Sequence, residues 1–237
     1  MTGSKQSRAK DDMATSSATI IPFNPLDKKN LGASVAEAML EQKPQPLGEL
    51  KQFMGVGIYA IYFTGQAKPY EPYESLATRN RDGAFRAPIY VGKAVPKGAR
   101  KGGGVGDVRS RALYDRLREH AESVELAENL DISDFFCRFL VVDDIWIPLG
   151  ESLLIAKFSP LWNQLIDGFG NHDPGKGRYE GMRPRWDVLH PGRLWATKCK
   201  EREETQEQIV RDVHNYFATF QFPSSPHVLG PDERGGA

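Results

Sequence analysis

GIYAIYF at residues 57–63 and YVGK at residues 90–93 are the two segments that decide the fold. Each sets a tyrosine close to a glycine in a run of apolar and aromatic residues, which is the composition of a β-strand. We therefore predict that both segments are strands. Tyrosines in strands ordinarily pack in a core through their rings, so position alone leaves open whether Tyr59 and Tyr90 serve packing or chemistry.

The other periodic segments predict a chain of mixed α and β structure. Ser34, followed three residues later by Glu37, is typical of a helix N-terminus, and Pro44 lies beyond the end of that helix. Asp107 is the expected N-cap of a second helix. The predicted strands are 56–63, 87–93 and 134–142, and the predicted helices are 34–42, 108–122, 148–158 and 202–218.

The chain has 237 residues and 40% hydrophobic content, which is enough for a buried core. Residues 1–20 and 223–237 are polar or turn-forming, so we expect both tails to be disordered. Residues 64–86 form a long polar connector between the first two strands, and such connectors are usually functional or disordered. No apolar run is long enough for a membrane span and no signal peptide is visible, so we expect a cytoplasmic protein without a membrane partner.

Charge is arranged in blocks, although the formal net charge is zero. Residues 86–120 contain nine basic and three acidic residues, residues 121–151 contain one basic and eight acidic, and residues 168–200 contain seven basic and three acidic. Basic stretches with glycine and aromatic residues are typical of proteins that bind a phosphate backbone, because lysine and arginine displace condensed counterions. Charge alone leaves a solvated surface loop as the alternative.

One acidic residue breaks the expected packing pattern. In the predicted helix 148–158, Glu151 lies on the same face as the apolar residues Leu154 and Phe158. A carboxylate that faces a core is costly unless it is paired, hydrogen-bonded, protonated or bound to a cation. Two interpretations are open: an ion pair with a neighbouring arginine, or a metal ligand.

The predicted helix 108–122 carries a second candidate pair. Arg116 and His120 are four residues apart, so they project from the same side of this helix. Taken alone, such a pair is more typical of a helix surface than of a site. The pair gains meaning only together with the tyrosines and Glu151.

Taken together, these residues resemble the GIY-YIG nuclease superfamily. GIY at 57–59, YVG at 90–92, Arg116 on the following helix and Glu151 on a later helix occur in its order and approximate spacing. The second motif has Val91 where the family name has isoleucine, and the connector between the motifs is long for the superfamily. The resemblance covers about residues 50–200.

A narrower resemblance is to the Type II restriction endonucleases of this superfamily that cut CCGCGG. It rests on His120 and Asn163, and on the segments GFGNHDPGKGR at 168–178 and WDVLHPGRLWA at 186–196. The resemblance implies an α+β fold in which helices flank a small central antiparallel sheet of about three strands. It also implies a single endonuclease domain at 21–222, with a catalytic core at about 50–165 and a basic extension at 166–222.

The resemblance assigns roles to the candidate residues. Glu151 would hold one divalent cation, Mg²⁺ with Mn²⁺ as a substitute, and a hard cation with one protein carboxylate keeps several waters. Arg116 would grip the scissile phosphate, for which its planar charged fork is suited. Gly57 and Gly92 would leave room for the substrate backbone to approach the tyrosines.

Proton transfer would fall to the tyrosines. Tyr59 is the candidate that takes the proton of the attacking water, but a free phenol has a pKa near 10 and needs help at neutral pH. Lys93 or His120 could supply that help, and His120 could instead relay the proton. Tyr90 would orient the water or the phosphate, and the roles of the two tyrosines are interchangeable. Asn163 would hold the glutamate or a phosphate oxygen.

Sequence specificity requires contacts to base edges, most economically from arginine or lysine to guanine. The candidates are the basic residues of the glycine-rich loop and of the extension, namely Lys97, Arg100, Lys101, Arg178, Arg183, Arg185 and Arg193. A palindromic duplex implies a homodimer, at least on DNA. The resemblance further implies a prokaryotic host and a companion DNA methyltransferase that acts on the same site without direct contact.

Two other functions fit part of the pattern. A GIY-YIG nuclease of repair or recombination would recognise DNA structure rather than a sequence, and discrete digestion bands would distinguish the two. A catalytically silent nucleic-acid-binding module would keep the fold without cleavage. The chemically competent side chains at all the candidate positions argue against the silent module.

Overall fold

The structure of the chain, a computed structural model, describes residues 24, 26–95, 110–173, 175, 179–225 and 227–228. It has the predicted α+β fold, with an antiparallel sheet of four strands in the order β1-β4-β2-β3. The strands are β1 (Gln45–Pro46), β2 (Gly57–Phe63), β3 (Tyr90–Ala94) and β4 (Phe135–Val141). The three strands predicted from the sequence are present, and the two-residue β1 adds a fourth beside β4.

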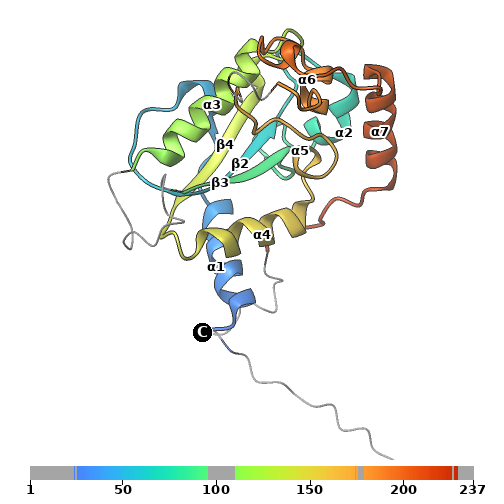
Figure 1. The fold of residues 1–237 in the computed structure, drawn as a ribbon. Helices are drawn as coiled ribbons and strands as arrows, with labels where there is room; N and C mark the ends of the chain where they lie inside the picture. Colours follow the sequence, from blue (N-terminus) through green and yellow to red (C-terminus); the bar gives the residue numbers. More distant parts are fainter. Residues whose placement is uncertain are drawn as a thin grey trace, which may run out of the picture.

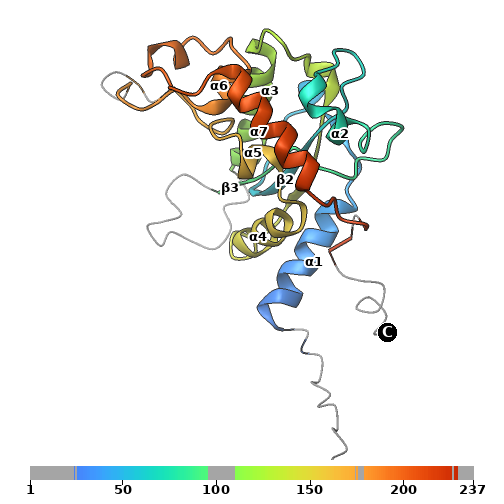
Figure 2. The same cartoon turned by 90° about the vertical axis from the view of Figure 1, so that its right-hand side faces the viewer.

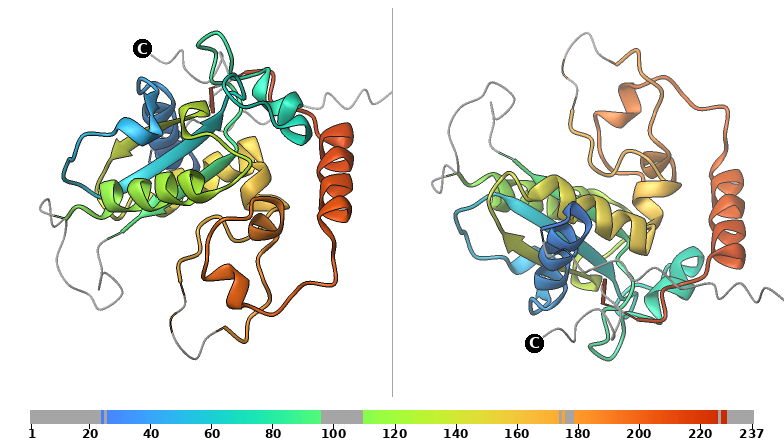
Figure 3. Two further views of the ribbon diagram at one scale, coloured as in Figure 1. Left: turned by 90° about the horizontal axis from the view of Figure 1, so that it is seen from above. Right: turned by 90° about the horizontal axis from the view of Figure 1, so that it is seen from below.

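Helices cover both faces of the sheet (Figure 1). They are α1 (Lys28–Leu40), α2 (Glu74–Ala77), α3 (Ala112–Leu126), α4 (Ile147–Phe158), α5 (Leu161–Gln164), α6 (Arg185–Leu189) and α7 (Gln206–Thr219). α1 packs against α4 on one face, and α3 lies over the other. Seen from above, α6 and its neighbouring loops lie on the β3 side of the sheet (Figure 3).

Strand β2 runs through the middle of the molecule, and all seven of its residues are buried. Because successive side chains of a strand point to opposite faces, β2 contributes to two separate cores. Ile58, Ala60 and Tyr62 pack with α1 and α4. The alternate residues, which begin with Tyr59, pack with α3 and with the aromatic side chains of the extension. The strand therefore fixes Tyr59 between β3 and α3.

Strand β3 forms one edge of the sheet, and helix α5 covers it. The backbone N–H of Trp162 donates to the carbonyl of Ile89 at 2.9 Å. One residue later, the side chain of Asn163 bonds both backbone groups of Val91. These contacts fix the edge strand that carries Tyr90.

The connector 64–86 is an ordered insertion that includes α2. The buried Asp134 carboxylate accepts hydrogen bonds from three backbone N–H groups near the start of the connector, at 2.6–2.8 Å. The Asn80 side chain donates to the carbonyls of Phe63 and Ala87 at 3.0 and 2.8 Å, so it joins the two ends of the insertion. Helix α7 lies beside α2, which ties the insertion to the C-terminal part of the chain (Figure 2).

Three helices begin four or more residues from their predicted starts. α1 begins earlier, because Asp27 rather than Ser34 caps it by accepting a backbone N–H of the first turn. α3 begins at Ala112 rather than 108, and its predicted cap Asp107 lies outside the described residues. α7 begins after Thr205, four residues later than predicted, because the capping box of Thr205 satisfies the first backbone donors of the helix. The short helices α2, α5 and α6 had no periodicity that could predict them.

The predicted tails lie largely outside the described residues. All of residues 1–20 and most of residues 223–237 belong to the undescribed part, so their disorder stays a prediction. The described Val228 donates its backbone N–H to Glu37 at 2.8 Å, so this point of the C-terminal segment contacts α1. Within the described ranges, no helix is both long and apolar enough to cross a membrane.

Candidate active site

Tyr59 and His120 form a buried hydrogen bond between the sheet and α3. The Tyr59 hydroxyl lies 2.7 Å from His120 Nε2, and both residues are almost fully buried. Burial raises the pKa of Tyr59 well above its ordinary value, with a further rise from Tyr90, whereas the Arg116 guanidinium opposes the rise. Burial, followed by Arg116, lowers the pKa of His120 well below its ordinary value. At neutral pH the phenol therefore donates to a neutral imidazole.

The two motif glycines make room within the protein. Gly92 lies opposite Tyr59 in the β2–β3 register, and a Cβ atom there would lie 2.5 Å from the Tyr59 hydroxyl. A Cβ atom on Gly57 would lie 1.9 Å from the carbonyl oxygen of Leu140 in β4. Gly92 is therefore needed to make room for the Tyr59 hydroxyl, and Gly57 is needed for the close packing of β2 against β4. That the glycines also leave room for a substrate backbone stays a prediction.

Arg116 joins the tyrosines to the loop that follows α5. Its Nη2 donates to the carbonyl of Gly170 at 2.8 Å, and its Nη1 bonds Glu119 at 3.2 Å and contacts His172 Nε2. The guanidinium opposes the burial-driven rise in the pKa of the Tyr90 hydroxyl, as it does for Tyr59. Arg116 therefore lies against both phenols while its other edge is held by the loop.

Tyr59, Tyr90, Arg116 and His120 form one cluster. A cleft of about 470 Å³ opens beside it. It is lined by Lys93, Ala94, Val95, Ala112, Asp115, Arg116, Glu119 and His172. Arg116 lies at its surface, whereas Tyr59 is fully buried and is not part of the lining. A second hollow of about 400 Å³ shares His172 with the cleft and extends toward Trp195.

Glu151 faces this region from α4, and in the structure it forms an ion pair. Its Oε2 lies 2.6 Å from Lys93 Nζ, and the two side chains are 16% and 42% exposed. One of the two interpretations was an ion pair with an arginine; the partner is instead the motif lysine. Glu151 also raises the pKa of both Tyr59 and Tyr90 through its charge, so it lies close to the phenols.

The donor set fits a cation that takes few protein ligands. Among the described residues there is no group of three or more His, Cys, Asp or Glu side chains that could hold a metal. Mg²⁺ commonly binds through one or two carboxylates, and waters and substrate phosphates fill the other positions. Glu151, mostly shielded and close to the phenols, fits that pattern once Lys93 moves aside.

Asn163 has a different position from the predicted one. Its Oδ1 accepts the backbone N–H of Val91 at 2.8 Å, and its Nδ2 donates to the carbonyl of the same residue at 2.8 Å. The amide therefore bonds the backbone between Tyr90 and Gly92 instead of a glutamate or a phosphate oxygen. It fixes the strand that carries Tyr90 and Lys93.

Four of the predicted DNA-reading residues fall outside the described part of the chain, namely Lys97, Arg100, Lys101 and Arg178. Arg183 is partly exposed, and its Nε donates to the carbonyl of Ala196 at 3.1 Å. Its terminal nitrogens make no hydrogen bond to the described residues. Arg183 therefore keeps donors that can reach a ligand.

Arg185 and Arg193 are bonded inside the protein, which corrects the expectation that they read bases. Arg185 is 15% exposed and pairs with Glu204 and, at 2.7 Å, with Asp212. Arg193 is 3% exposed and pairs with Asp187 at 2.6 Å. Reading a base would require breaking these ion pairs, and for Arg193 it would leave the buried Asp187 unpaired.

The structure adds Phe169, Gly170 and His172 to the cluster. Phe169 stacks on His120 with ring centroids 4.4 Å apart, and Gly170 and His172 contact Arg116. All three belong to the segment GFGNHDPGKGR, one of the segments on which the family resemblance rested. That resemblance was the signal for these residues, because the segment has no periodicity.

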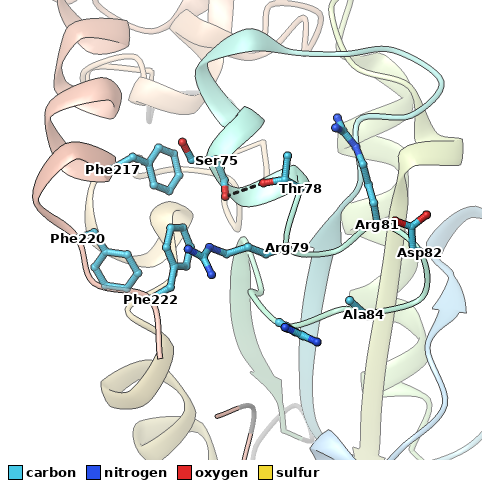
Figure 4. Close-up of a pocket in the computed structure, with 10 residues that line it drawn as sticks. Ser75, Thr78, Arg79, Arg81, Asp82, Ala84, Phe217, Phe220 and Phe222 are labelled. Carbon is cyan, nitrogen blue, oxygen red and sulfur yellow. Dashed lines mark hydrogen bonds between the residues drawn. The ribbon is translucent and has the colours of Figure 1, made fainter. Parts of the chain in front are cut away.

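A larger hollow, of about 810 Å³, lies away from the tyrosines, between α2 and the end of α7 (Figure 4). Arginines and phenylalanines line it, and the Arg79 guanidinium lies 3.9 Å above the ring centre of Phe222. None of the predicted catalytic residues contributes to it. Its size therefore does not mark the reactive centre, and the smaller cleft above Arg116 is the candidate.

A family model described as the Eco29kI GIY-YIG domain matches residues 51–217 of the chain. The match covers β2 to β4, the insertion, the cluster around Tyr59 and most of α7. No curated protein matches the chain.

Proposed function

Because the chain belongs to the Eco29kI GIY-YIG domain family of restriction-type endonucleases, we propose that it is a Type II enzyme that cuts one DNA sequence. The proposed site is a GC-rich palindrome such as CCGCGG, and the proposed cofactor is Mg²⁺, with Mn²⁺ as a substitute. The observation that supports this best is the buried Tyr59–His120 hydrogen bond behind Arg116, which itself lines a cleft together with Lys93.

The attacking water would lose its proton through Tyr59 to His120. A free phenolate is disfavoured, because burial raises the pKa of Tyr59 well above its ordinary value. A coupled transfer avoids it: Tyr59 Oη accepts the proton of the water as its own proton passes to His120 Nε2 over 2.7 Å. His120 can accept, because its lowered pKa keeps it neutral. The phosphate of bound DNA favours the imidazolium that results.

Arg116 would bind the scissile phosphate and uncover Tyr59 in doing so. In the free protein its guanidinium lies against Tyr59, Glu119 and Gly170. A phosphate offers paired acceptors that match the planar fork better than these scattered partners. Rotation of Arg116 toward the cleft would open the path from solvent to the Tyr59 hydroxyl. Tyr90, which is partly exposed, would orient the phosphate or the water.

Glu151 would be the protein ligand of the divalent cation, and Lys93 its partner in the free protein. When bound, the cation would supply charge neutralisation at the phosphate and stabilisation of the departing 3′ oxygen. Lys93, released from Glu151, would contact the phosphate from the side of the cleft that it lines. Asn163 would act by holding the strand that carries Lys93 and Tyr90, rather than by touching the substrate.

The partners follow from a palindromic duplex target. We propose a homodimer on DNA, with one active site for each strand. Base contacts would come from Lys97, Arg100, Lys101, Arg178 and Arg183. A host that carries such an enzyme needs a methyltransferase for the same site, and both would act in the cytoplasm of a prokaryote. The catalytic core at about 50–165 and the extension at 166–222 would work as one domain.

Digestion of a sequenced plasmid by the purified protein in Mg²⁺ tests the proposal. We expect discrete bands whose ends map to one palindromic sequence. A smear, or cutting only at branched substrates, would instead support a nuclease that recognises DNA structure. Binding without cleavage in either Mg²⁺ or Mn²⁺ would support a silent module and contradict the proposal.

A further inference from the structure

The extension contains a buried charge pair, Arg193 with Asp187. The two residues are 3% and 5% exposed, and they form a bidentate contact at 2.7 Å from Nε and 2.6 Å from Nη2. Burying such a pair carries a desolvation cost that often offsets its attraction, so stability alone is a weak reason for its presence. The other contacts of Arg193 indicate a different role.

The remaining donors of Arg193 bond one short loop. Nη1 donates to the carbonyls of Phe169 and Asn171 at 3.3 and 3.1 Å, and Nη2 donates to the carbonyl of Gly168 at 3.0 Å. All five N–H groups of the guanidinium are thus used. Its faces lie over Trp186 and Trp195, at 4.4 and 4.9 Å from the ring centres. Arg193 therefore fixes the loop 168–171 along its backbone.

The opposite side of this loop contacts the candidate active site. Phe169 stacks on His120 at 4.4 Å with an interplanar angle of 16°, and it meets the edge of Tyr90 at 5.1 Å. The carbonyl of Gly170 accepts from Arg116 at 2.8 Å. A Cβ atom on Gly170 would lie 2.9 Å from Arg116 Nη2 and 3.0 Å from the Tyr90 hydroxyl. The position of the loop thus limits where three of the proposed reactive side chains can lie.

We propose that Arg193 is a positioning residue for cleavage: by holding the loop 168–171 it places Arg116 and His120 for the reaction. This rests on the proposed nuclease function. Lysine cannot replace arginine in this role, because a single ammonium cannot pair with Asp187 and also span three carbonyls. A loop displaced by about 1 Å is enough to reduce the rate of a well-oriented reaction by about 10²-fold.

The first test is Arg193→Lys, which keeps the charge opposite Asp187. We expect the single-turnover cleavage rate to fall by about 10²-fold, whereas KM and the dissociation constant for cognate DNA in Ca²⁺ stay within about threefold, a shift under 1 kcal/mol. The acid limb of the pH–rate profile should move to higher pH, because a loosened Phe169 lets water reach His120. Arg185→Lys is the matched control, since Arg185 forms ion pairs in the same extension without touching this loop.

Gly170→Ala tests the same inference from the other side of the loop and leaves the buried pair intact. We expect the same loss of rate without a change in thermal stability or DNA affinity. A normal rate in both variants overturns the inference, as does a loss of DNA affinity that equals the loss of rate. Absence of cleavage by the unaltered protein would instead count against the proposed function, so the two failures are distinguishable.

Discussion

The described residues contain two buried tyrosine–histidine pairs with nearly the same geometry. Tyr59 and His120 are 2.7 Å apart between the sheet and α3, and Tyr73 and His190 are 2.8 Å apart between the insertion and the extension. All four side chains are at most 1% exposed. Burial lowers the pKa of both histidines, that of His190 to about 3.

The neighbours of the two pairs differ. Tyr73 also accepts from Trp162 Nε1 at 3.1 Å, and His190 Nδ1 lies 2.9 Å from Asn129 Oδ1, so that pair is closed by neutral partners. Arg116 and Glu151 act on Tyr59 through their charges, and Arg116 lines a cleft. The difference teaches that this hydrogen bond does not itself mark a catalytic pair. Tyr59 and His120 differ from Tyr73 and His190 in having charged, movable neighbours with access to a ligand.

The largest expected effect comes from removing the Glu151 carboxylate near Tyr59 and His120. Glu151→Ala should lower the single-turnover cleavage rate at least about 10³-fold. The cation that neutralises the phosphate charge would lose its protein ligand. Affinity for DNA and thermal stability should change little. Glu122→Ala, on an exposed face of α3, is the control. Full cleavage by Glu151→Ala in Mg²⁺ would refute the assignment of the metal ligand.

Removing each phenol hydroxyl in turn tests the comparison directly. Tyr59→Phe should slow cleavage by about 10²-fold or more, the usual contribution of a positioned acid or base. Tyr73→Phe should leave the rate unchanged and destabilise the protein by about 1–3 kcal/mol, because Trp162 and His190 each lose a buried partner. Rates and urea unfolding curves measure the two effects. Equal losses of rate in both variants would contradict the distinction.

Both histidines should make stability depend on pH in the same direction. In the unfolded chain a histidine takes up a proton near pH 6.5, whereas burial keeps both folded residues neutral at lower pH. The free energy of unfolding should therefore fall as the pH drops below about 6.5, by up to about 1.4 kcal/mol per pH unit for each histidine. For His190 this continues to about pH 3.

Urea unfolding between pH 7 and pH 4 measures this slope. His190→Gln should remove the contribution of one bound proton from this slope. A slope that His190→Gln leaves unchanged would contradict a neutral buried imidazole.

The smallest expected effect concerns the metal. Lys93→Met should tighten the binding of Mn²⁺ to the DNA-free protein by about tenfold, or about 1.4 kcal/mol, because the cation no longer competes with an ammonium 2.6 Å from Glu151. Titration calorimetry without DNA measures this. Lys51→Met, at an exposed position, is the control. Unchanged affinity would show that Lys93 does not shield the carboxylate.

The sheet and its central residues could be predicted because their signals are local. β-branched and aromatic runs identified the three main strands, and the apolar periodicity of α4 singled out Glu151. The order of the motifs predicted that Tyr59, Arg116 and Glu151 share a site, and the structure brings them together. Their chemical roles stay predictions.

The extension could not be predicted in the same way, because its order comes from contacts distant in sequence. Nothing near Arg193 indicates that its partners are the carbonyls of residues 168–171, more than 20 positions earlier. A count of basic residues treats Arg193 and Arg183 alike, although one is buried and the other partly exposed. The role of Asn163 was missed for the same reason, since it lies in α5 and its partner Val91 lies in β3, 72 positions earlier.

Both borders of the sheet are partly blocked against further strands. On one side Asn163 occupies the backbone groups of Val91, and on the other β1 is only two residues long and contains Pro46, which has no N–H to donate. A row of free backbone groups would invite other chains to add on and aggregate. We therefore expect the proposed homodimer to join through helices or loops rather than through a continuous sheet.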